Sequence, residues 1–81
     1  MFLAMVPLSI SAEADEFEEL SVGEEHELLI PIKQKLNWLT YDRINVNKRF
    51  GTWTETRIKQ FQRDYGLEDT GIIDLITYEK L

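Results

Sequence analysis

Residues 50–77 read FGTWTETRIKQFQRDYGLEDTGIIDLIT, and this stretch decides the fold. Its first half repeats at three- to four-residue intervals, which predicts a helix whose inward face holds Thr54, Ile58, Phe61 and Tyr65. Thr52 and Glu55 have the spacing of a capping box, so we expect the helix to begin there. Gly66 is suited to end it, because glycine readily adopts the left-handed conformation that closes many helices.

The second half of the stretch predicts a turn and a short last helix. Thr70 and Gly71 are typical turn residues. Asp74 is placed to cap a helix that runs to Leu81, because its carboxylate can accept a hydrogen bond from the first turn. The apolar residues around these signals are expected to form the core, chiefly Phe50, Ile58, Phe61 and Leu67.

Upstream of the stretch, the pattern predicts a first helix over residues 31–40. Pro31 is tolerated at a helix start, and apolar residues then recur at helical spacing as Ile32, Leu36 and Leu39. Trp38 falls outside this apolar stripe, so we expect it to be partly exposed. Residues 41–49 are polar and basic and are expected to form a loop. The body is therefore predicted to be all-α, with three short helices joined by loops.

Taken in order, the motifs of residues 30–81 resemble those of the three-helix peptidoglycan-binding domain found in bacterial cell-wall hydrolases. The family pattern combines Leu-x-x-Leu, Phe-Gly-x-x-Thr, Phe-Gln, Gly-Leu and Thr-Gly-x-x-Asp-x-x-Thr. This sequence matches it at Leu36 and Leu39, at Phe50, Gly51 and Thr54, at Phe61 and Gln62, at Gly66 and Leu67, and at Thr70, Gly71, Asp74 and Thr77. It departs where the family often has Gly, Ala and an Asp-Gly pair, at Thr40, Arg57, Asn47 and Lys48.

The resemblance implies a small orthogonal three-helix bundle over residues 30–81. It further implies a non-catalytic, monomeric module that binds peptidoglycan and targets an attached or partner hydrolase to the bacterial wall. Such a module would be secreted or periplasmic and would need neither a cofactor nor a metal. A protein-docking module or a helix-turn-helix-like nucleic-acid binder remains the alternative.

Peptidoglycan offers sugar rings with apolar faces and peptide stems with amides and carboxylates. A binder therefore needs exposed aromatic rings, amide groups and a few cations. The candidate ligand-binding residues are Trp38, Tyr41, Arg43, Asn45, Arg49, Trp53 and Gln62. Each has a structural alternative: the two tryptophans can cover the edge of a small core, the arginines can be ordinary surface charges, and the glutamine can hydrogen-bond a loop backbone.

The N-terminal part of the chain has a different composition. Residues 1–14 resemble the apolar and cleavage regions of a truncated secretory signal peptide, although the usual basic segment is missing; the alternative is an N-terminal arm. This apolar run is too short to span a bilayer. The formal net charge of −6 arises here, since residues 1–29 hold eight acidic residues and no Lys or Arg. Residues 15–29 are therefore predicted to be a flexible acidic linker.

The residue types argue against several other functions. The chain has no cysteine, its one histidine is His26 in the acidic segment, and its serines precede the body, so no nucleophilic triad can be placed. The acidic residues near the end are better explained as helix ends and turns than as a sugar-cleaving pair: Asp64, Glu68, Asp69 and Asp74. The supposed recognition helix of a helix-turn-helix would carry only Lys80 as a base, so nucleic acid is not an expected partner.

Overall fold

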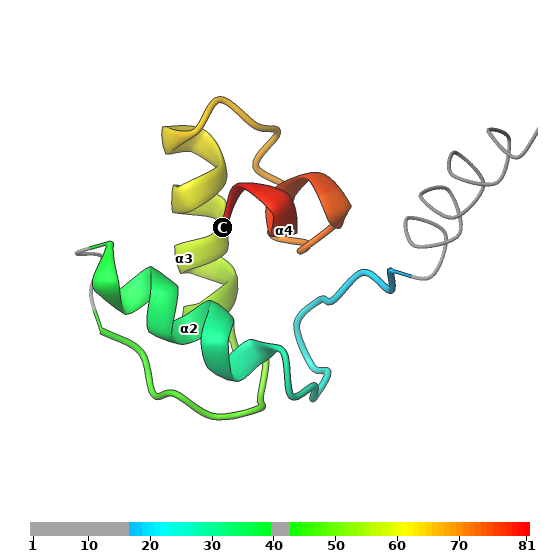
Figure 1. The fold of residues 1–81 in the computed structure, drawn as a ribbon, viewed down its shortest axis with the longest axis vertical. Coiled ribbons are helices and arrows are strands. Elements are labelled where there is room, and N and C mark those ends of the chain that lie inside the picture. Colours follow the sequence, from blue (N-terminus) through cyan, green and yellow to red (C-terminus); the bar gives the residue numbers. More distant parts are fainter. Residues whose placement is uncertain (1–16, 40–42) are drawn as a thin grey trace, which may run out of the picture.

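The computed structural model describes residues 17–39 and 43–81. These described residues form three helices, α2 (Leu29–Trp38), α3 (Thr52–Asp64) and α4 (Leu75–Lys80). Figure 1 shows that α2 runs across α3 rather than along it, with α4 beside them. Pairing between extended segments in the described part of the chain is limited to two isolated antiparallel bridges. The predicted all-α bundle is confirmed.

One hydrophobic core holds these elements together, with residues from α2, from α3 and from the segments that precede each of the three helices. Its buried members are Leu20, Leu29, Ile32, Leu36, Phe50, Ile58, Phe61 and Ile73. Three of the four predicted core residues are confirmed. The fourth, Leu67, is only partly buried, because it lies in the loop that follows the end of α3. Tyr65 was expected to face inward but is 46% exposed, although its ring stacks on Phe61 with centroids 4.4 Å apart.

The helix starts differ in detail from the predictions. The first helix begins at Leu29, two residues before its predicted start, because a turn from His26 to Leu29 leads directly into it. Pro31 still falls in the first turn, where a missing N–H costs little. The predicted capping box at Thr52 and Glu55 is wrong. Thr52 is already the first residue of α3, and Gly51 occupies the N-cap position, so no side chain caps the start of this helix.

The predicted helix ends in residues 62–77 are confirmed. Gly66 has a φ of 74° and closes α3, while the Leu67 N–H donates to the Gln62 carbonyl at 2.7 Å, as in a Schellman motif. The Asp74 side chain caps α4 by accepting a hydrogen bond from the Thr77 N–H at 2.9 Å.

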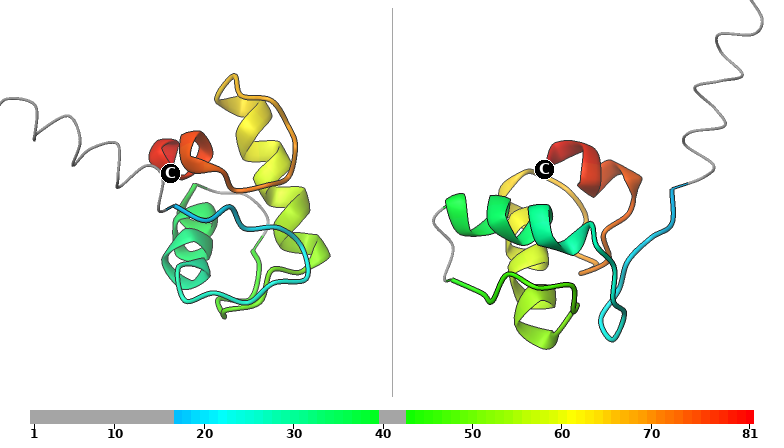
Figure 2. Two further views of the ribbon diagram at one scale, coloured as in Figure 1. Left: turned by 90° about the vertical axis from the view of Figure 1, so that its right-hand side faces the viewer. Right: turned by 60° about the horizontal axis from the view of Figure 1, so that its bottom comes forward.

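The acidic segment is part of the domain from residue 17 onward, so it is not the linker that its charge predicted. Leu20 is buried and exchanges two backbone hydrogen bonds with Ile73, at 3.1 and 2.9 Å. Further along, residues 23–26 pair with residues 48–50 through three backbone hydrogen bonds. Figure 2 shows this segment, coloured blue to cyan, leading into α2. The glutamates of this segment are exposed, whereas the Leu20 side chain between them is buried in the core.

Two predictions concern residues outside the described part of the chain: the signal-like stretch 1–14 and the candidate ligand-binding residue Tyr41. Within the described ranges, no helix is long and apolar enough to cross a membrane.

Candidate functional site

A groove of about 660 Å³ lies between α2, the loop before α3 and the first turns of α3. We call it the main groove. It is lined by Lys33, Arg43, Ile44, Asn45, Asn47, Arg49, Gly51, Thr52, Trp53, Thr54 and Arg57. Four of these side chains are basic, and none of the described lining residues is acidic. Its volume is in the range of sites that bind drug-sized ligands.

One wall of the main groove comes from α3, where Trp53 and Arg57 lie one turn apart. The Trp53 side chain is 70% exposed, which is unusual for so large an aromatic residue. The Arg57 guanidinium carbon lies 5.9 Å from the centroid of the Trp53 ring, within the range of a cation–π contact. Arg57 is itself mostly buried and contacts Gln60 Oε1 at 3.5 Å. Its guanidinium group is therefore held in place by contacts with both Trp53 and Gln60.

On the α2 side, the main groove is lined by Lys33, a buried lysine. Its Nζ donates to Asn47 Oδ1 at 2.7 Å and to the Arg49 carbonyl oxygen. Asn47 Oδ1 also accepts from the Arg49 N–H at 3.0 Å, so one lysine fixes the shape of the loop. Burial lowers the pKa of Lys33 from its ordinary value, and the positive charge of Arg49 lowers it further.

A smaller hollow of about 260 Å³, the side pocket, adjoins the main groove at Arg43, which lines both. Its other lining residues are Gln34, Asn37, Trp38 and Val46. The Asn37 side chain forms two hydrogen bonds with the loop. Its Nδ2 donates to the Ile44 carbonyl and its Oδ1 accepts from the Ile44 N–H, each at 3.0 Å. Trp38 is 77% exposed, which confirms the expected exposure.

The structure therefore brings together five of the seven candidate residues. Arg43, Asn45, Arg49 and Trp53 line the main groove, and Trp38 and Arg43 line the side pocket. Tyr41 lies outside the described residues.

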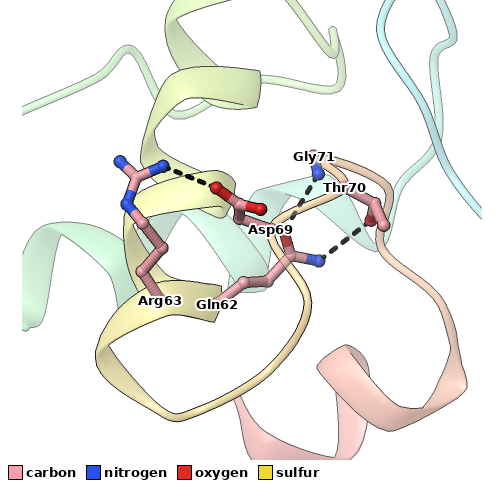
Figure 3. A network of polar contacts seen from close by, with 5 residues as sticks. All are labelled: Gln62, Arg63, Asp69, Thr70 and Gly71. Carbon is pink, nitrogen blue, oxygen red and sulfur yellow. Dashed lines mark hydrogen bonds and ion pairs between the residues drawn. The ribbon is translucent and has the colours of Figure 1, made fainter.

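The structure does not support Gln62 as a candidate ligand-binding residue, because its side chain is 1% exposed and lines neither hollow. Its Oε1 accepts from the Gly71 N–H at 2.9 Å, and its Nε2 donates to the Ile72 carbonyl and to Thr77 Oγ1, each at 3.0 Å. A longer contact of 3.4 Å reaches Thr70 Oγ1 (Figure 3). The side chain holds the turn before α4 against α3, which is the structural alternative rather than ligand binding.

Among the groove residues that the sequence interpretation missed are Lys33, Asn47 and Arg57. No site role is assigned to either cation from the sequence, yet both occupy the inner side of a helical stripe. Lys33 follows Leu29 by four residues, and Arg57 follows Thr54 by three. A cation at such a position extends its apolar stem over the core and presents its charge at the edge. This spacing was the available signal.

The acidic side chains weighed for catalysis have other roles where contacts are known. Asp69 pairs with Arg63 at 3.0 Å, and Asp74 caps α4. Neither lines the main groove. In the described part of the chain, no group of three His, Cys, Asp or Glu residues is arranged to hold a metal ion. The arrangement suits binding by hydrogen bonds, charge and ring contact.

Comparisons with known proteins found one family model and solved structures that are similar to this chain. A crystal structure of a peptidoglycan-binding protein from Clostridioides difficile, in complex with glutamine hydroxamate, has 25% sequence identity and a TM-score of 0.66. The match covers 78% of this chain and 39% of that chain, so this chain spans well under two thirds of that protein's length. A search of curated proteins gave no match. The model of the peptidoglycan binding domain family matches residues 25–81, which is most of the chain. The chain therefore belongs to the peptidoglycan binding domain family.

Proposed function

We propose that this chain is a non-catalytic module that binds peptidoglycan through the main groove and the side pocket. One observation carries the proposal beyond family membership. Two tryptophans, each more than two thirds exposed, line adjoining hollows that also present amide and guanidinium groups. Exposed indole rings cover the apolar faces of sugars or the aliphatic parts of peptides, and the polar groups fix orientation.

Binding of this kind would hold an attached or partner hydrolase close to its substrate. A tether raises the local concentration of the catalytic domain without supplying chemistry of its own. The proposed location is therefore the cell wall, reached by secretion or in the periplasm. The related C. difficile protein, which is more than twice as long as the aligned region, is compatible with such a module being one part of a larger protein.

The test is co-sedimentation of the full chain with purified peptidoglycan sacculi. We expect the chain to pellet with sacculi, and we expect Trp53→Ala and Trp38→Ala to weaken binding roughly tenfold each, as for central aromatic residues of other interfaces. Ile76→Ala is the matched control, because Ile76 is 59% exposed on α4 and lines neither hollow. Circular dichroism establishes that every variant is folded.

Failure of the native chain to pellet above an unrelated acidic protein would overturn the proposal. Equal losses for Ile76→Ala and the tryptophan variants would move the binding surface away from the main groove. Retention on duplex DNA at physiological salt would instead favour the nucleic-acid alternative. That alternative has little structural support, because α4 has only six residues and Lys80 is its only basic one.

A further inference from the structure

The main groove concentrates positive charge from three separate parts of the chain. Lys33 comes from α2, Arg43 and Arg49 from the loop, and Arg57 from α3. The chain as a whole has a formal charge of −6, so this cluster runs against its overall charge. Like charges that converge in a hollow repel one another, and an anionic ligand relieves that repulsion.

From this cluster we infer that the main groove recognises a free carboxylate of the peptide stem, rather than the glycan strand. This inference rests on the proposed function and assigns the part of peptidoglycan that the groove contacts. The glycan consists of neutral N-acetylated sugars, which offer no negative charge to the exposed guanidinium groups of Arg43 and Arg49. The stem carries free carboxylates, and guanidinium groups bind these through paired, charge-assisted hydrogen bonds.

The remaining lining residues suit the rest of a short peptide. Asn45 and Asn47 offer amide groups that match peptide N–H and C=O groups, and Trp53 and Ile44 offer apolar surface for short aliphatic side chains. A compact phosphate would need only part of this surface. An extended peptide with one or more carboxylates uses the cations, the amides and the ring together.

The groove is also held in shape before any ligand arrives. Lys33 ties α2 to Asn47 and Arg49, and Asn37 fixes the loop at Ile44 through two hydrogen bonds. Such a preformed site loses less conformational entropy on binding than a mobile loop would. Two of the cations, Arg43 and Arg49, are exposed at its surface, where a ligand can reach them.

The first experiment compares three soluble ligands: a synthetic stem tetrapeptide with free carboxylates, the same peptide with its carboxylates amidated, and an N-acetylglucosamine oligomer. The chain has only two tryptophans, so a Trp38→Phe variant leaves Trp53 as a fluorescent reporter within the main groove. We expect the free peptide to bind at least roughly tenfold more tightly than the amidated one, since a charge-assisted hydrogen bond is lost on amidation. Raising the salt concentration should narrow this difference.

The second experiment tests the arginines. Arg49→Gln and Arg43→Gln should reduce the preference for the free over the amidated peptide, whereas Lys48→Gln should leave it intact. Lys48 is the matched control, because it is an exposed neighbour of Arg49 that lines neither hollow. The ratio of the two affinities is the readout, since a general loss of folding would lower both affinities and leave their ratio unchanged.

The outcomes separate this inference from the proposed function. Sacculi that bind equally well before and after carbodiimide amidation of their carboxylates would overturn the inference and leave peptidoglycan binding intact. Tighter binding of the sugar oligomer than of the free peptide would do the same. Loss of binding after hydrofluoric acid removes phosphate polymers from the sacculi would assign the groove to phosphate and also overturn the inference. Failure to bind any sacculi would overturn both.

Discussion

Gln62 joins three parts of the domain through one buried amide. Its carbonyl oxygen accepts from Gly71, and its NH₂ group donates to Ile72 and Thr77, so α3, the turn and α4 depend on the same side chain. No described side chain leaves a buried nitrogen or oxygen without a hydrogen-bond partner. Removing this amide would take hydrogen-bond partners from Gly71 and Thr77.

We therefore expect Gln62→Leu to destabilise the fold by about 2–4 kcal/mol, because the Gly71 N–H and the buried Thr77 hydroxyl lose the hydrogen-bond partner that Gln62 gives them. Urea denaturation followed by circular dichroism measures the loss. Gln34→Leu, which changes the same groups on the exposed side of α2, should shift stability by less than about 0.5 kcal/mol. The folded fraction of Gln62→Leu should keep its affinity for sacculi. Lost affinity in a stably folded variant would restore Gln62 as a ligand-binding residue.

At the scale of elements, the acidic segment before α2 acts as an extended strap over the core. It pairs with the loop before α3 at Arg49 and with the chain before α4 at Ile73, although it belongs to no strand. Leu20 is its buried anchor at 3% exposure. By pairing with residues 48–50, the strap also supports the backbone that carries Arg49 into the main groove.

Leu20→Ala should cost about 2–4 kcal/mol of stability, because it leaves a cavity in the core that the other elements cannot fill. Val22→Ala, in the same segment but 43% exposed, is the matched control and should cost under about 1 kcal/mol. Chemical denaturation of both variants gives the comparison. Equal, small effects would mean that the segment is the dispensable linker that its composition predicted.

At the scale of the whole molecule, the sequence predicts what depends on neighbouring residues and misses what depends on distant ones. Gly66 and Asp74 act on their own helix ends, so these boundaries are local and were predicted. Leu20 enters the core only because Ile73 lies opposite it, and no local pattern shows that pairing. The acidic residues around Leu20 favour a linker, because charge density can be read from neighbouring residues. The burial of Leu20 cannot be read in this way, because it depends on a distant part of the chain.

The candidate site divides in the same way. Exposure of Trp38 follows from its place outside the apolar stripe of its own helix, and the polar loop stands out by composition. Lys33 and Arg57 belong to helices that cross (Figure 1), and only this crossing brings both residues to the lining of one groove. Gln62 failed as a candidate because a family motif does not say whether its residue contacts a ligand or the fold.

Stability of the whole domain should depend on pH partly through Asp69. A hydrogen bond from Arg63 holds the pKa of Asp69 below its ordinary value of 3.8, so the folded state favours the ionised carboxyl. The resulting stabilisation is present above about pH 4 and is lost as the pH falls through the lowered pKa. Both side chains are about half exposed, so the effect is small and screened by salt.

We expect Asp69→Asn to melt slightly below the native chain at pH 7 and at the same temperature as the native chain near pH 2. Glu68→Gln removes a neighbouring charge, and its melting temperature should not converge on that of the native chain as the pH falls. Thermal melts of the three proteins across this range are the measurement, and a gap between Asp69→Asn and the native chain that persists at low pH would contradict the role of the ion pair.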